Sequence, residues 1–213
     1  MSVIVITPPA SRRLTTVENV RQDLGLPADT PLDAQILRHI DAQSGRAARY
    51  CNREFGLHTV RERIARPPHG RGESITLSRG PIAQIVSIMM DGRVLDPSQY
   101  EADGLSVYML SAGTRSAWSG SILHVAYDAG YVLPGQDAGA APAGAEPLPA
   151  DIERAVILLV GAALSTSRRD PMLKSDRVEG IGQRDYYVQG QNAAMPLPEA
   201  EEALRPYRRV TFA

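Results

Sequence analysis

The period of the hydrophobic pattern changes near residue 52, and this change limits the kind of fold that the chain can form. Before it, apolar residues recur every three or four positions, as on one face of a helix. After it, apolar and polar residues alternate, as in strands with one buried face. A chain that holds the two patterns in separate stretches is expected to be an α+β protein.

Two helices are predicted before the change. Thr15 and Glu18 have the Thr-x-x-Glu spacing of a capping box, and Gly25 is a natural helix end. Thr30, followed by a proline, can begin a second helix whose apolar stripe continues to Cys51. We therefore expect a helical hairpin over residues 15–51.

The alternating pattern predicts an antiparallel β region over residues 57–131. Alternation is clearest over 58–64, and Asp91-Gly92 is a strong hairpin-turn signal. Residues 134–149 are almost all Gly, Ala and Pro, which is typical of a flexible loop.

A third helix is predicted over residues 150–165, where an apolar face recurs at helical spacing. Residues 172–198 hold no sustained apolar pattern, and Tyr186-Tyr187-Val188 suggests a strand of three residues. From Pro198 the pattern predicts one or two turns of helix with Ala200, Ala203 and Leu204 inward, stopped by Pro206. Residues 172–213 as a whole are interpreted as an extended C-terminal arm that folds against something else. Residues 1–171 then form the core. The predicted fold is α+β, mainly a helical bundle with a small antiparallel β region and an extended C-terminal arm.

Composition excludes several classes of protein. The 213 residues suit one domain of ordinary size, and 43% of them are hydrophobic, so wholesale disorder is not expected. With 23 basic and 24 acidic residues the formal net charge is −1, whereas a protein that grips DNA broadly carries a basic excess. No apolar run reaches the about 18 residues of a membrane span, and the apolar start is too short for a signal peptide.

The sequence offers no convincing catalytic, cofactor or metal site. No two of its four histidines stand close enough in sequence to suggest a shared metal: His39, His58, His69 and His124. Cys51 lies on an apolar helix face and is interpreted as a buried thiol rather than a nucleophile. Trp118 is expected to cover the edge of the core, with ligand stacking as the weaker interpretation. We therefore expect neither an enzyme nor a cofactor.

The C-terminal arm holds the best candidates for contact with a partner. Tyrosine and arginine are enriched at interface hot spots, and both occur repeatedly in this arm. The candidate interface residues are Tyr186, Tyr187, Leu204, Tyr207, Arg208 and Arg209.

Several short motifs occur in an order that resembles the head–tail connector (adaptor) family of long-tailed bacteriophages and prophages. Each motif alone is weak, but eight in the right order are hard to obtain by chance, and the resemblance covers most of residues 4–133 and 148–209. The motifs include Leu14-Thr-Thr-Val-Glu18, Arg53-Glu-Phe55, Leu77-Ser-Arg-Gly-Pro-Ile82, Asp91-Gly92, Val125-Ala-Tyr-Asp-Ala-Gly-Tyr131 and Leu204-Arg-Pro-Tyr-Arg-Arg209.

The resemblance implies a structural protein of the virion neck, made in the cytoplasm of the bacterial host. It implies a ring of roughly a dozen copies under the portal, around the DNA channel. The implied partners are the portal protein, other copies of the chain, a stopper or tail-side neck protein, and DNA that passes without specific binding. The C-terminal arm would contact the portal and neighbouring copies.

Two other interpretations stay open at this stage. The chain could be another neck protein, such as a stopper or tail-completion subunit, although those are usually dominated by β structure. A DNA-binding packaging factor is conceivable because a helical hairpin lies near the N-terminus, but the missing basic excess counts against it.

Overall fold

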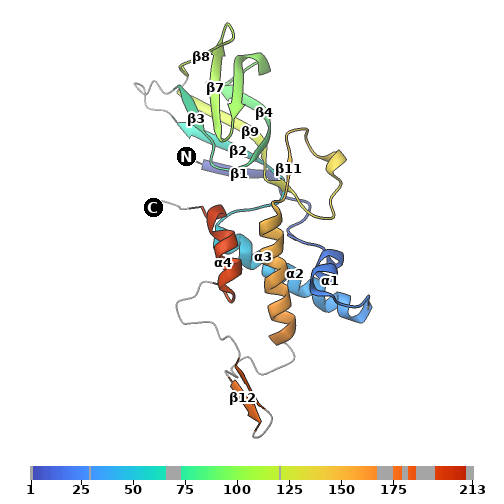
Figure 1. The fold of residues 1–213 in the computed structure, drawn as a ribbon. Coiled ribbons are helices and arrows are strands. Elements are labelled where there is room, and N and C mark those ends of the chain that lie inside the picture. Colours follow the sequence, from blue (N-terminus) through green and yellow to red (C-terminus); the bar gives the residue numbers. More distant parts are fainter. Residues whose placement is uncertain are drawn as a thin grey trace. The chain divides into compact units, whose positions relative to one another are not determined.

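The chain folds into two compact units, each assembled from two separate chain segments (Figure 1). The β unit combines Met1–Ser11 with Phe55–Pro147, and the helical unit combines Arg12–Glu54 with Leu148–Ala213. The computed structural model describes residues 2–28, 30–65, 73–119, 121–166, 175–178, 182–185 and 195–209.

The β unit contains a five-stranded antiparallel sheet in the order β1-β2-β9-β4-β5. Its strands are β1 (Ser2–Thr7), β2 (His58–Ala65), β9 (Ile122–Ala129), β4 (Ile82–Met90) and β5 (Arg93–Val94). A second antiparallel sheet has the order β3-β7-β6, with β8 paired to β7. Its strands are β3 (Ser74–Thr76), β7 (Ser106–Ser111), β6 (Tyr100–Asp103) and β8 (Thr114–Ser116).

One core cluster joins the two sheets of the β unit. Alternation along β2 and β9 turns every second side chain inward, and Val60, Leu123 and Val125 are completely buried. Ile75 and Val107 of the second sheet belong to the same cluster. The opposite face of the five-stranded sheet therefore carries the remaining, more polar positions of these strands.

The β unit is completed by short elements. Asp91 and Gly92 both have positive φ, as the predicted hairpin turn between β4 and β5 requires. Strands β10 (Tyr131–Val132) and β11 (Glu146–Pro147) pair in parallel and so close the base of the loop at 134–149. The 3-10 turns are η1 (Pro97–Gln99) and η2 (Ala138–Ala140).

The helical unit contains four α-helices among the described residues. They are α1 (Val17–Leu24), α2 (Thr30–Cys51), α3 (Ala150–Thr166) and α4 (Pro198–Leu204), followed by the 3-10 turn η3 (Arg205–Tyr207). Helix α3 contacts each of the other three helices (Figure 1). Its Ile152, Val156 and Val160 are completely buried. A separate hairpin pairs β12 (Ser175–Val178) with β13 (Gly182–Asp185).

The N-terminus of α1 differs from the predicted capping box. The cap is Thr16, whose hydroxyl accepts a hydrogen bond of 3.2 Å from the Asn19 backbone N–H. Thr15 is buried, and its hydroxyl donates to Glu153 Oε1 of α3 at 2.9 Å. Two adjacent threonines offer two caps, and the long-range bond to Glu153 decides between them. Gly25 ends the helix with a φ of 60°, as predicted.

The predicted fold class is wrong in its emphasis on a helical bundle. Helices and strands take up similar shares of the described residues, and apart from the parallel β10–β11 pair the strands form three antiparallel sheets. The two long helices α2 and α3 leave a periodic apolar pattern in the sequence, whereas strands of two or three residues leave little periodicity. The short helix predicted from Pro198 is confirmed as α4, but residues 195–209 do not form an extended arm, because α4 and η3 fold this segment.

No helix in the described ranges combines the length and the apolar character that crossing a membrane requires.

Candidate interface site

The described end of the predicted arm packs against the chain's own helices. Leu204 is completely buried, and its carbonyl oxygen lies 3.6 Å from the Cys51 Sγ, which donates to it. The Arg209 backbone N–H donates to the Cys51 carbonyl oxygen at 2.9 Å. Met195 and Ala200 are completely buried as well. Residues 195–209 therefore belong to the core of the helical unit.

The other candidate residues in this segment present polar groups near the surface. The Tyr207 hydroxyl donates to the Asp151 carboxylate, with the nearer oxygen at 2.8 Å. Arg208 is exposed, and its guanidinium carbon lies 5.5 Å from the centroid of the Tyr50 ring. Partial burial, followed by the charge of Glu201, raises the pKa of Tyr50. Tyr50, Arg208 and Glu201 thus meet where α4 and η3 pack against the end of α2.

Two candidates cannot be placed in this site. Tyr186 and Tyr187 lie outside the described residues, as does the short strand that the sequence suggested there.

Three of the family-like motifs meet at one place in the β unit. The Tyr131 N–H donates to the Phe55 carbonyl at 2.7 Å, and the Gly130 N–H donates to the Pro81 carbonyl at 2.9 Å. Gly130 has a φ of 114°, and a Cβ there would lie 2.5 Å from the carbonyl oxygen of Gly56. These motifs therefore form a structural junction. The close approach of the backbones there requires glycine at position 130, and it requires no reactive side chain.

A buried carboxylate holds the same junction from inside the core. Glu62 is completely buried, and its Oε2 accepts from the Tyr127 hydroxyl at 2.8 Å. The same oxygen accepts from the backbone N–H and the hydroxyl of Ser78, each at 3.0 Å. The Tyr127 oxygen in turn accepts from the Arg79 N–H at 3.1 Å. Burial, and then the bond to Glu62, raise the pKa of Tyr127 far above its usual value.

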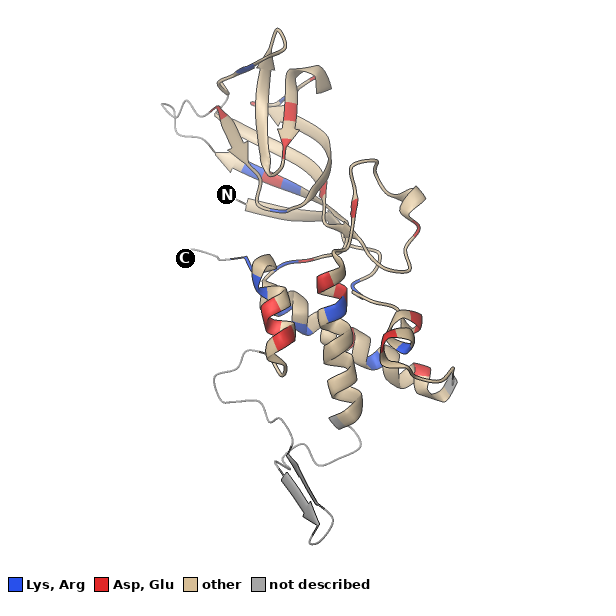
Figure 2. Cartoon of the chain, in the orientation of Figure 1, with Lys and Arg blue, Asp and Glu red and all other residues tan. Residues whose placement is uncertain are grey.

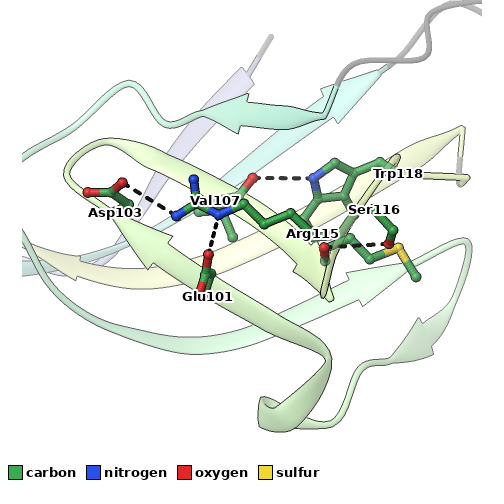
Figure 3. A network of polar contacts seen from close by, with 7 residues as sticks. Glu101, Asp103, Val107, Arg115, Ser116 and Trp118 are labelled. Atoms are coloured by element: carbon green, nitrogen blue, oxygen red, sulfur yellow. Dashed lines mark hydrogen bonds and ion pairs between the residues drawn. The ribbon is translucent and has the colours of Figure 1, made fainter. Parts of the chain in front are cut away.

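Trp118 belongs to the core rather than to a ligand site. It is 3% exposed, and its indole N–H donates to the Val107 carbonyl at 3.2 Å (Figure 3). On the neighbouring strands, Arg115 pairs with Glu101 and lies 3.6 Å from Asp103. Arg115 also lies over the Tyr108 ring, 3.8 Å from its centroid. This network fastens the β6–β7–β8 sheet.

The remaining candidates from the sequence form no shared site in the described residues. No group of three or more His, Cys, Asp or Glu side chains there is arranged to hold a metal ion. Cys51 is completely buried, and desolvation raises the pKa of its thiol to about 11. A thiol of that kind is mostly protonated at neutral pH and is a poor nucleophile.

The structure adds one surface that sequence reasoning missed. Ile4, Val5 and Ile6 of the edge strand β1 are 52%, 53% and 51% exposed. Next to them, Arg61 and Arg63 of β2 are exposed on the outer face of the five-stranded sheet. The alternation over 58–64 already placed these two arginines on one face. Only the pairing of β2 with β1, fifty residues earlier in the chain, brings the apolar residues beside them.

Comparison with known proteins identifies the fold as one found in virus-like particles. No protein-family model matches the chain, and no curated protein matches it. The similarity is instead to solved structures, and it extends over the whole chain.

Two of these structures come from gene transfer agent (GTA) particles. One chain belongs to the neck of an empty GTA particle computed with C6 symmetry, with a TM-score of 0.53. Another belongs to the virion of a native GTA particle, with a TM-score of 0.55. In both cases the identity is 16%, and the match covers 100% of this chain and 98% of the other. At this identity the likeness establishes a shared fold.

Proposed function

We propose that the chain is a head–tail adaptor, a structural protein of the neck of a phage-like particle. The observation that carries this proposal is the fold shared, over the full length of both chains, with a chain of a GTA neck. The order of motifs in the sequence supports the same function.

In this proposal the chain forms a ring of about a dozen copies between the portal protein and a stopper or tail-side neck protein. DNA passes through the ring without specific binding, and the formal net charge of −1 is compatible with a wall that does not retain DNA. The protein is made in the host cytoplasm and ends in the virion neck. The function needs interface surface and no catalytic site.

The segment that contains α4 and η3 is proposed to contact the portal. Arg208 and Tyr207 present a guanidinium and a phenol at this surface, which are groups that are common at interface hot spots. Leu204 would contribute indirectly by anchoring α4 to the core, since it is completely buried. Tyr186, Tyr187 and Arg209 complete the proposed set.

The mass of the protein in solution, alone and with the portal protein of the same genome, tests the function. Light scattering should find a ring, or many copies recruited onto each portal. A monomer that ignores the portal would overturn the adaptor role and favour a stopper or tail-completion subunit. Salt-dependent retention on DNA, measured in parallel, would favour a packaging factor instead.

Point variants test the docking segment better than its deletion does. Removing residues 175–213 would also remove the buried Met195, Ala200 and Leu204, so the helical unit would lose part of its core. Arg208→Glu should weaken portal binding about tenfold or more, because a hot-spot arginine is replaced by the opposite charge. Arg93→Glu, at an exposed arginine of the β unit, is the matched control. Equal binding by the two variants would exclude Arg208 from the interface.

A further inference from the structure

A basic surface on the β unit has no counter-charge among the described residues. Arg61 and Arg63 point outward from β2, because their neighbours Val60 and Glu62 are buried on the inner face. Figure 2 shows the basic residues of β2 on the sheet.

The cross-strand neighbours of these arginines are all uncharged or basic. Arg61 pairs with Ile4 of β1 on one side and with Ala126 of β9 on the other. Arg63 stands between Ser2 of β1 and His124 of β9. No ion pair joins either arginine to a carboxylate in the described part of the chain.

An acidic residue on the same strand pair is already engaged. Asp128 of β9 is opposite Thr59 of β2, and it accepts from the Thr59 hydroxyl at 2.6 Å. Its second oxygen accepts from the Gln84 side-chain amide at 2.6 Å. Asp128 is therefore committed to its own sheet, and Arg61 and Arg63 remain available to a carboxylate from elsewhere.

An apolar residue on each side completes this surface. Ile4 on β1 is 52% exposed, and Ile122 on β9 is 37% exposed, although both are large apolar side chains. We call Ile4, Arg61, Arg63 and Ile122 the basic sheet face. Arginine beside exposed apolar residues is the composition of a protein interface, where Arg is enriched and most other charged residues are depleted.

The same chain carries a surface of opposite charge. Glu199 and Glu202 are exposed on α4, and Figure 2 shows acidic residues along this helix. The only ion pair recorded for Glu199 in the described residues is with Arg154 at 4.0 Å, with both side chains more than 60% exposed. Such a pair contributes little and is easily exchanged. Glu201 differs, because it accepts from the Tyr50 hydroxyl at 3.4 Å.

We propose that the basic sheet face of one copy binds Glu199 and Glu202 of α4 in the next copy. This inference rests on the proposed function, because a ring needs a head-to-tail contact between two different surfaces of the same chain. The partner is a second copy, since the opposite charge that the arginines lack is present on another exposed element of the chain. Complementary charge then selects the register of the ring.

Charge reversal followed by mixing tests the contact. Arg61→Glu/Arg63→Glu and Glu199→Arg/Glu202→Arg should each weaken self-association about tenfold or more, because like charges then face each other. Mixing the two variants restores an opposite pair at every contact, so assembly should return with the two variants alternating. Arg38→Glu/Arg93→Glu, at two exposed arginines outside both surfaces, is a control with the same change in net charge as the first variant. Sedimentation velocity at low and at physiological salt gives the masses.

Cross-linking detects the contact even where association is weak. A chain with both Arg63→Cys and Glu202→Cys, joined by a short bis-maleimide, should give a ladder of dimers, trimers and longer products. A two-fold contact would stop at dimers, and either single cysteine alone should give no ladder. Cys51 is completely buried and should stay unlabelled.

The outcomes separate this contact from the proposed function. Restored assembly on mixing, together with a ladder, supports the contact. If the wild type forms rings, the charge-reversal variants also assemble and no ladder appears, the contact is wrong. The adaptor function then still stands. A wild-type chain that gives neither ring nor ladder, with or without portal, overturns both. If the arginine variant instead loses DNA binding that the wild type shows, the basic sheet face serves nucleic acid and the proposal is wrong.

Discussion

The β unit exposes large apolar side chains, whereas the helical unit buries its own. In the described residues, all the large hydrophobic side chains that are strongly exposed belong to the β unit: Ile4, Val5, Ile6, Val86, Val94, Leu105 and Ile122. Three of them form half of the edge strand β1. A long apolar edge strand without charged residues is usually covered in a working protein. The comparison suggests that apolar association surfaces lie on the β unit.

The two units also differ in what they bury. The β unit encloses the carboxylate of Glu62 and the phenol of Tyr127, bonded to each other. The helical unit encloses mainly aliphatic side chains, with hydroxyls such as that of Ser44, which accepts from the Leu14 N–H at 3.1 Å. A polar core is sensitive to the loss of one hydrogen-bonding group, and an aliphatic core is sensitive to lost volume.

The largest effect on stability should come from removing one large buried side chain from the core of each unit. Trp118→Ala should lower the free energy of unfolding by about 3–5 kcal/mol, and Leu204→Ala by about 2–5 kcal/mol. Peptide-level hydrogen exchange should show faster exchange in β2 and β9 for the first variant, and in α2 and α4 for the second. Equal acceleration throughout both units in either variant would mean that they unfold as one.

The polar core of the β unit gives the next effect. Glu62→Ala removes the acceptor of one buried and two partly buried hydrogen bonds and should cost about 3 kcal/mol in the free energy of unfolding. Glu62→Gln keeps an acceptor oxygen and is the matched control, with a smaller loss. Urea unfolding followed by circular dichroism measures both. If the two variants lose the same stability, the bonds to Ser78 and Tyr127 are not what holds the junction.

Alkaline pH should act on the helical unit through Cys51. Burial raises the pKa of this thiol from 9.0 to about 11, so the folded state keeps a proton that the unfolded state loses between these values. The stabilisation is complete below pH 9 and is lost as pH rises towards 11, by about 2 kcal/mol. The Cys51→Ala variant should not show this loss of stability at alkaline pH. Parallel pH profiles for the two proteins in urea unfolding would contradict the assignment.

The smallest effect should come from the surface of the helical unit. Tyr207→Phe removes the bond to Asp151 and should cost about 1 kcal/mol, confined to α4 and η3. Tyr108→Phe in the β unit is the control, because no hydrogen bond is recorded for that hydroxyl in the described residues and its ring contact with Arg115 is kept. Thermal melts of the two variants give the comparison.

Local features of the fold could be predicted from the sequence, and pairing between distant segments could not. Gly25 and the Asp91-Gly92 turn follow from local backbone preferences, and both are found as predicted. The choice of Thr16 over Thr15 as the cap depends on Glu153, more than 130 residues away, so no local rule finds it. The weight of β structure was underestimated for the same reason, since strands of two or three residues are defined only by their partners.

The candidate site shows the same division. Residue type alone pointed to Tyr207 and Arg208, and the structure places both near the surface of the helical unit. The apolar spacing also predicted Leu204 on the inward face of a short helix, and Leu204 lies in the core. Arg61 and Arg63 were overlooked because the sequence does not show which residues lie beside them on the neighbouring strands.

The construction of each unit from two distant segments has a consequence for synthesis on the ribosome. Strand β1 emerges first but waits for β2, which follows only after the whole of Arg12–Glu54. The helices α2 and α3 in turn wait for Met195, Ala200 and Leu204. A chain released before these residues keeps an uncovered apolar surface, which proteases and chaperones recognise. Truncated copies should therefore be removed before they can take a place in an assembly and leave a gap in its wall.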